Sequence, residues 1–182
     1  MKKDYFIGCT HFGHINILNY CDRPFNDIDE MNETLIENIN HKVKRGNNLW
    51  ILGDFGFGGS DDIKKIVRRL YTKNVFLIRG NHDKLTEKKY KECGFQWCKD
   101  YYEISREING RMRKIVMFHY PIYSWNAKFR GSYHLHSHTH NSMPDDLSLN
   151  RMNVGVDVCN FSPVSLQEVK EFMSLKEIVD YE

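Results

Sequence analysis

The chain has 182 residues, a length that suits one compact domain over residues 1–182. Apolar residues make up 41% and aromatic residues 13%, so the chain can bury a hydrophobic core and a wholly disordered protein is excluded. The formal net charge is +2 and no long block of like charge occurs, so a protein that coats a polyanion is not expected.

The N-terminal residues and the cysteines indicate the cellular compartment of the protein. Asp4 stands where a signal peptide would need its apolar run, and no segment approaches the roughly 18 apolar residues of a membrane span. The five cysteines form no CxxC pair, which favours reduced thiols over a disulfide framework. We therefore expect a soluble cytoplasmic protein without membrane contact, and the sequence leaves its oligomeric state open.

In the first half of the chain, short apolar strands alternate with amphipathic helices. We expect strands over residues 5–9, 49–52 and 75–78, and helices over residues 31–43 and 61–70. Asp29 or Asn32 would cap the first of these helices. Wholly apolar strands separated by helices indicate a parallel sheet that is covered on both faces.

The second half changes character. Strands over residues 101–108 and 112–118 flank an Asn-Gly turn, which is a strong hairpin signal. Further strands are expected over residues 131–136 and 152–158. A last helix would follow Pro163, with Ser165 as N-cap and Glu168 completing a capping box. The pattern predicts a single domain of the α/β class.

Polar residues follow the apolar strands at five places along the chain. They are Cys9, His11 and His14; Asp54; Asn81, His82 and Asp83; His119; and His136, His138 and His140. The carboxyl ends of strands are where open α/β sheets bind ligands, and thiol, carboxylate, amide and imidazole groups are metal ligands. In Cys9-x-His11 and His138-x-His140, alternate residues of an extended segment would point the same way. Asp54 has two carboxylate oxygens and can bridge two cations.

Each of these residues also has a simpler interpretation. A lone His at a strand end is usually a hydrogen-bonded structural residue, and Cys9 alone is usually a small buried hydrophobe. Asp54 and Asn81 could be turn residues, and Asp83 could be a helix cap. Five strand ends that all carry ligand-capable groups favour a metal site over packing.

The order of these motifs resembles the calcineurin-like metallophosphoesterase superfamily, whose motifs are D-x-H, G-D, G-N-H-[DE], a lone His and G-H-x-H. The chain has Cys9-x-His11, Gly53-Asp54, Gly80-Asn81-His82-Asp83, His119 and Ser137-His138-Thr139-His140 in that order. The segments at residues 10–14, 23–25 and 153–157 also resemble a small prokaryotic and phage branch of phosphoesterases.

The resemblance implies a four-layer αββα sandwich of two mixed sheets flanked by helices. It also implies two divalent or mixed-valence transition-metal ions, zinc, iron or manganese, with a water or hydroxide nucleophile between them. One ion would be held by Cys9, His11, Asp54 and His140, and the other by Asp54, Asn81, His119 and His138. His82 would not bind metal but would act as the catalytic proton donor beside the site.

Two residues depart from the family pattern. Ser137 replaces a glycine, which is a small change, whereas Cys9 replaces an aspartate. A thiolate keeps the negative charge but is softer and binds at about 2.3 Å, which favours zinc or iron over magnesium or manganese. The alternative is that Cys9 is an inert thiol and the first metal site is weak or empty.

Three residues are candidates for substrate contact. Arg23 and Arg79 could each clamp a phosphate through the guanidinium group, although Arg79 could instead be a surface or salt-bridged residue. His14 could touch the substrate or orient another group. The aromatic and basic stretch at residues 123–130 could stack on a nucleobase or simply pack as a loop on the site.

The sequence thus predicts a metal-dependent phosphomonoesterase or phosphodiesterase, acting on a small phosphorylated and nucleotide-like substrate. One alternative is a nuclease, which the small net charge does not favour because strong binding of a nucleic-acid backbone needs several clustered cations. The other is a degenerate member that binds metal without catalysis, for which the change at Cys9 is the sole support.

Overall fold

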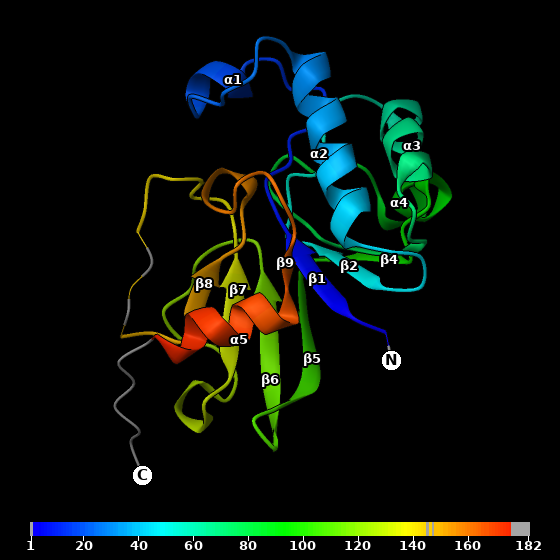
Figure 1. The fold of residues 1–182 in the computed structure, drawn as a ribbon. Helices are drawn as coiled ribbons and strands as arrows, with labels where there is room; N and C mark the ends of the chain where they lie inside the picture. The colour runs from blue at the N-terminus through cyan, green and yellow to red at the C-terminus, as the bar shows by residue number, and fades with distance from the viewer. Residues whose placement is uncertain (1, 145, 147, 176–182) are drawn as a thin grey trace.

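The first sheet is mixed and forms around the predicted parallel strands (Figure 1). The structure is a computed structural model and describes residues 2–144, 146 and 148–175. The strand order is β4-β3-β2-β1-β9, with β1 (Asp4–Ile7), β2 (Asn48–Ile51), β3 (Asn74–Ile78), β4 (Trp97–Lys99) and β9 (Val164–Ser165). The β1–β2, β2–β3 and β3–β4 pairs are parallel, and β9 runs antiparallel to β1.

The second sheet is also mixed, in the order β5-β6-β7-β8. Its strands are β5 (Tyr101–Ile108), β6 (Arg111–Phe118), β7 (Tyr133–His136) and β8 (Arg151–Asn153). The β5–β6 hairpin turns at Asn109 and Gly110, and both have positive φ (53° and 74°), as a two-residue hairpin turn requires. Parallel pairing of β6 with β7 and of β7 with β8 completes the sheet.

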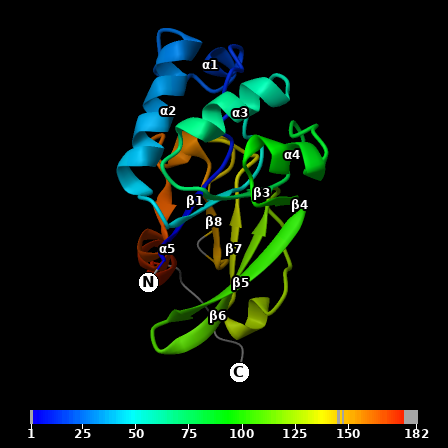
Figure 2. The same ribbon diagram turned by 90° about the vertical axis from the view of Figure 1, so that its right-hand side faces the viewer.

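Helices flank this pair of sheets. They are α1 (Ile17–Tyr20), α2 (Ile28–Lys42), α3 (Ser60–Arg69), α4 (Glu87–Cys93) and α5 (Leu166–Ser174), with short 3-10 helices at Lys128–Arg130 and Val156–Val158. Figures 1 and 2 show α2, α3 and α4 together at one end, over the first sheet, and the β5–β6 hairpin reaching the other end. The helix α5 contacts β8, β9 and β1. The predicted α/β fold of two mixed sheets with flanking helices is confirmed.

Two hydrophobic cores lie on the two faces of the first sheet. Ile7, Leu49 and Ile51 pack with the helices, whereas Phe6 and Trp50 pack with the second sheet. Successive side chains of a strand point to opposite faces, so a sheet buried on both sides needs apolar residues at every position. This burial explains the wholly apolar strands of the sequence.

Two of the differences from the sequence prediction have a clear physical cause. The side chain of Asp27, and not that of Asp29 or Asn32, caps α2 by accepting a hydrogen bond from the Glu30 amide at 2.8 Å. The strand predicted over residues 152–158 ends at Asn153, whose Oδ1 accepts from the Gly155 amide at 2.9 Å and turns the chain. The predicted capping box of Ser165 and Glu168 is confirmed.

Among the described residues, no helix is both long enough and apolar enough to span a membrane.

Candidate metal centre

The candidate ligands gather where the carboxyl ends of strands from both sheets meet. In Figure 1 the strands β1, β6 and β7 end toward the same side of the molecule. A cavity of about 450 Å³ opens there. Seven of the predicted site residues line it: His11, His14, Asp54, Asn81, His82, His138 and His140. Cys9 and His119 are fully buried beside it.

The backbone at these strand ends is unusual. Cys9, His11, Asp54, His138 and His140 all have positive φ, between 47° and 52°. The extended geometry predicted for Cys9-x-His11 and His138-x-His140 is therefore wrong, because these residues have left-handed backbone conformations. Residues with a Cβ adopt this region rarely and at an energetic cost, and such strain concentrates at functional sites. The conformation thus supports a functional role for this cluster.

One group of ligand atoms comes from Cys9, His11 and His140, which lie within 4.8 Å of one another. The Nε2 atom of His11 is buried and has no hydrogen-bond partner, and it lies 3.7 Å from Oδ2 of Asp54. Burial lowers the pKa of His11 to about 3, so the ring is neutral and offers a lone pair. A buried nitrogen without a partner, beside a carboxylate, fits a cation.

A second group surrounds His119. Its Nδ1 lies 2.8 Å from the carbonyl oxygen of Leu52, which only accepts, so Nδ1 carries the proton and Nε2 presents a lone pair. That Nε2 lies 3.1 Å from Oδ1 of Asn81, 3.1 Å from Nδ1 of His138 and 3.4 Å from Oδ2 of Asp54. The same oxygen of Asp54 therefore faces both His11 and His119, as a bridging carboxylate would.

Cys9 belongs to both groups of ligand atoms. Its Sγ lies within 4.8 Å of ligand atoms of Asp54 and His119 as well as of His11 and His140, and it accepts from the His138 amide at 3.1 Å. Burial raises the pKa of the Cys9 thiol far above its ordinary value. The thiol is thus neutral in the protein alone, and a bound cation would favour the thiolate.

Asp83 has a role that the sequence prediction did not foresee. Its buried carboxylate accepts from the backbone amides of Gly80 and Asp54 at 2.8 Å each and from that of Phe55 at 3.1 Å. Tyr90 adds its hydroxyl at 3.3 Å. Asp83 therefore ties the loop after β3 to the loop after β2 and fixes Asp54. It is neither a helix cap nor a member of the candidate ligand groups among the described residues.

The Arg23 guanidinium is buried, and Arg23 is not among the residues that line the cavity. Its five N–H groups donate to both carboxylate oxygens of Asp157, to the Cys9 and Thr10 carbonyls, and to the Met31 sulfur, at 2.7–3.3 Å. With every donor used inside the protein, Arg23 is better suited to a structural role than to the predicted phosphate contact.

Arg79 also lies outside the cavity lining. Its Nη1 donates to the Asp83 and Leu85 carbonyls at 3.0 and 2.8 Å, and its Nε lies 3.2 Å from Oδ1 of Asp100. This placement matches the salt-bridged alternative. Residues 123–130 do not line the cavity either, and Lys128 sits over the Tyr123 ring at 4.0 Å from its centroid.

His82 and His14 face the cavity without belonging to either ligand group. The His82 amide donates to Oδ1 of Asp54 at 2.8 Å, while its exposed ring stands 5.7 Å from the His11 ring, centroid to centroid. His14 stacks on Phe57 at 3.9 Å, and its Nδ1 lies 3.3 Å from Nδ1 of His11. Both side chains can therefore contact a molecule bound in the cavity.

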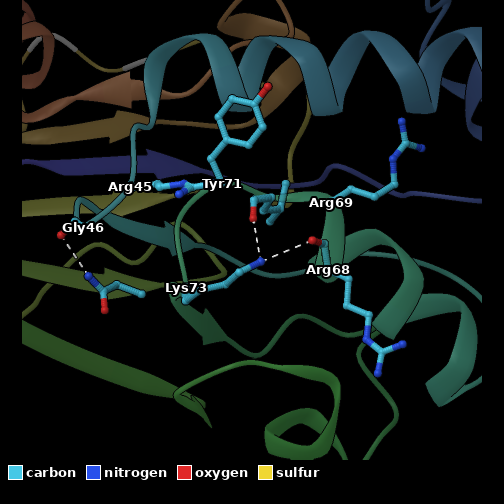
Figure 3. Close-up of a pocket in the computed structure, with 8 residues that line it drawn as sticks. Arg45, Gly46, Arg68, Arg69, Tyr71 and Lys73 are labelled. Atoms are coloured by element: carbon cyan, nitrogen blue, oxygen red, sulfur yellow. Dashed lines mark hydrogen bonds between the residues drawn. The ribbon is translucent and has the colours of Figure 1, made fainter.

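A second cavity, of about 590 Å³, lies near the amino-terminal ends of β2 and β3 and is rich in cations (Figure 3). Figure 3 shows the Arg68 and Arg69 side chains pointing apart. Arg69 donates to Oε1 of Glu33 at 2.6 Å, and Lys73 donates to the Arg68 and Leu70 carbonyls at 3.2 and 2.8 Å. Lys73 therefore caps the carboxyl-terminal end of α3, Arg69 pairs with an acidic residue of α2, and the Arg68 and Arg69 side chains do not converge.

The fold and the clustered side chains define an α/β protein with a candidate metal centre, and comparison with known proteins specifies the family. The family model for calcineurin-like phosphoesterases matches residues 5–143. The chain belongs to this family of metal-dependent phosphoester hydrolases.

Two individual proteins are similar to this chain over nearly its whole length. The uncharacterized protein MJ1445 of Methanocaldococcus jannaschii is 32% identical over 185 residues, which cover 98% of this chain and 96% of that protein. The crystal structure of a protein of unknown function, AQ665 from Aquifex aeolicus, aligns with a TM-score of 0.73 at 23% identity. It covers 94% of this chain and 100% of the other, and at this identity it supports the fold alone.

Proposed function

We propose that the protein hydrolyses phosphate esters with a dinuclear transition-metal centre and a water nucleophile. The observation that carries this proposal is the convergence of ligand atoms within 4.8 Å of one another, from Cys9, His11 and His140 and from Cys9, Asp54 and His119. Soft and nitrogen ligands of this kind suit zinc or iron, with manganese as a third candidate. One ion would be held by Cys9, His11, Asp54 and His140, and the other by Asp54, Asn81, His119 and His138.

The metal ions, Asp54 and His82 would each have a separate role in the reaction. When bound, two cations lower the pKa of a water, orient the phosphate and neutralise charge on the attacking and leaving oxygens. Asp54 is held by the His82 amide at Oδ1, which leaves Oδ2 directed to the ligand groups. The His82 ring lines the cavity beside them, where it would donate a proton to the leaving oxygen.

The size and the aromatic lining of the cavity suit a small substrate with a planar group. Its volume of about 450 Å³ is in the range of small-molecule sites. His14 and Phe57 stack to form one wall, and Tyr20, which is 73% exposed, continues it with its ring 6.1 Å from that of His14. Such a wall can stack on a nucleobase. We therefore favour a nucleotide-like ester, in which the phosphate lies near His82.

The proposal is tested by metal reconstitution. The metal-free protein would be loaded with zinc, iron or manganese and assayed with p-nitrophenyl phosphate and bis-p-nitrophenyl phosphate, alongside the Cys9→Asp variant. We expect turnover with at least one metal, and a shift toward manganese in Cys9→Asp because a harder ligand replaces the thiolate. If the wild-type protein neither binds metal nor hydrolyses either ester, the proposed enzymatic function is excluded. An unchanged metal preference in Cys9→Asp would identify Cys9 as a bystander.

The same metal-loaded protein, assayed in addition with single-stranded DNA and RNA, separates the two alternatives. A nuclease would cleave single-stranded DNA or RNA with steep salt dependence, which the net charge of +2 does not favour. A degenerate member would bind metal weakly and show no turnover with any ester. The retention of Asp54, Asn81 and the histidines in one cluster supports the enzyme over this second alternative.

A further inference from the structure

Two segments far apart in the sequence meet behind the candidate metal centre. Arg23 follows α1, and Asp157 lies in the 3-10 helix Val156–Val158. Nε of Arg23 donates to Oδ1 of Asp157 at 2.8 Å, and Nη2 donates to Oδ2 at 3.0 Å. The two side chains are 0% and 2% exposed, so this bidentate pair is shielded from solvent.

The pair also contacts residues of the centre itself. Oδ2 of Asp157 lies 2.7 Å from Nδ1 of His140. On its other side, the Arg23 guanidinium donates to the carbonyls of Cys9 at 2.7 Å and Thr10 at 3.0 Å. One buried ion pair thus holds both the His140 ring and the backbone that carries Cys9.

This contact determines which nitrogen of His140 faces the centre. A carboxylate only accepts, so the hydrogen bond requires the proton on Nδ1 and leaves the lone pair on Nε2. Arg23 donates to both carboxylate oxygens of Asp157 and so fixes the carboxylate in the orientation that meets His140. Carboxylates that hold a metal-binding histidine in this way raise metal affinity.

We propose that Asp157 and Arg23 are positioning residues that set the metal affinity of the site containing Cys9, His11 and His140. This inference rests on the proposed function, because it requires that site to bind metal. At the other site, which contains His119, the tautomer of the histidine is fixed by the Leu52 carbonyl and not by a carboxylate. The two sites should therefore respond differently when the ion pair is changed.

Asp157 is better explained as a positioning residue than as a ligand. Ligand atoms of Cys21, His140 and Asp157 do lie within 4.8 Å of one another. However, both Asp157 oxygens already accept from Arg23, whose fixed positive charge would repel a cation bound there. The proton on Nδ1 of His140 also blocks the nitrogen that this third group would use.

The test is Asp157→Asn, measured by zinc titration in competition with a chelator and by nitrogen NMR of the metal-free protein. Either orientation of the amide sets an N–H against an N–H of Arg23, so the hydrogen-bonded arrangement is weakened. We expect zinc affinity at one site to fall by about 10–100-fold while the other site is unchanged. We also expect His140 to lose its single Nδ1–H tautomer, a signal that general destabilisation would not produce.

Asp4→Asn is the matched control. Asp4 is another buried carboxylate, and Arg106 donates to its two oxygens at 2.6 and 3.0 Å, away from the cavity lining. Its zinc affinities and His140 tautomer should equal those of the wild type. If Asp157→Asn keeps both affinities and the tautomer, the inference is wrong although the proposed function stands. If the wild type binds no zinc, the proposed function fails and the inference fails with it.

Discussion

Cys9 is the thiol in a set of proposed ligands that otherwise consists of carboxylate, amide and imidazole groups. Its sulfur lies within 4.8 Å of ligand atoms from both candidate sites, and burial raises its thiol pKa. A carboxylate at this position would be charged before any metal arrived, whereas the thiol must lose a proton as the cation binds. Metal binding through Cys9 therefore selects for cations soft enough to favour sulfur, such as zinc.

His82 is the residue we expect to move a proton. Replacing it by Asn should lower kcat by about 10²–10⁴-fold for an alkyl phosphate ester, since an alkoxide leaves poorly without protonation. The loss should be smaller for p-nitrophenyl esters, whose leaving group is stable as an anion. Metal content should stay unchanged because His82 belongs to neither ligand group. The measurement is the ratio of the two kcat values.

His41→Asn is the matched control for this variant. His41 is exposed in the last turn of α2, so its replacement should leave both rates as they are. An equal loss for alkyl and p-nitrophenyl esters in His82→Asn, or a loss of metal, would contradict the role of His82 as proton donor.

At the scale of elements, the sequence predicts the larger pieces well. The strands β1, β2 and β3 are short apolar runs, and the helices α2 and α3 have apolar residues at helical spacing. All five are found near the predicted residues. The helices and strands missed are short: α1 has four residues, α4 seven, β4 three and β9 two. Such pieces are stabilised by tertiary contacts and carry no periodicity of their own.

The residues of the candidate site could be predicted from the sequence, but their backbone conformations could not. Ligand chemistry at strand ends and motif order identified the residues that the structure brings together. The positive φ values of Cys9, His11 and Asp54 were not predictable, because a non-glycine residue takes this conformation only when the surrounding fold imposes it. The Arg23–Asp157 pair was missed for a similar reason: it joins residues 134 positions apart.

The loops after β2 and β3 pack backbone to backbone, and Gly80 makes this possible. A Cβ at Gly80 would collide with the amide nitrogen and Oδ1 of Asp54. Gly80→Ala should therefore displace Asp54, destabilise the fold by about 1–3 kcal/mol and lower metal content. Urea denaturation and metal analysis would measure both effects.

Gly59→Ala provides the comparison for Gly80→Ala. A Cβ at Gly59 would meet only Oδ2 of Asp62, at 3.9 Å, which is an ordinary contact. Metal content should not change in this variant. A Gly80→Ala protein with wild-type metal content would show that the loop after β3 does not position Asp54.

At the scale of the whole molecule, the candidate centre is built across the two sheets. Cys9, Asp54 and Asn81 follow strands of the first sheet, whereas His119 and His138 follow strands of the second. Neither sheet carries a complete ligand set, so the packing of the sheets is a condition for metal binding. Contacts that join the sheets far from the centre should then affect stability without changing the chemistry of the site.

The Asp4–Arg106 ion pair is such a contact, because it links β1 of the first sheet to β5 of the second. Asp4 also accepts from Nε1 of Trp50 at 2.8 Å and from Nδ2 of Asn48 at 2.9 Å. At neutral pH, Asp4→Asn should lower the free energy of unfolding by about 1.5–3 kcal/mol, the usual range for hydrogen bonds to a charged group. Urea denaturation at several pH values would measure this difference.

The difference should depend on pH in a defined direction. Burial alone would raise the pKa of Asp4, but hydrogen bonds from Arg106, Asn48 and Trp50 outweigh it and lower the pKa below its ordinary value of 3.8. A lowered pKa in the folded state adds stability above pH 3.8, and this stability is lost as the pH falls through the folded-state pKa. The wild type and Asp4→Asn should therefore converge in acid. A gap that stays constant from neutral pH to acid would show that the Asp4 charge does not hold the two sheets together.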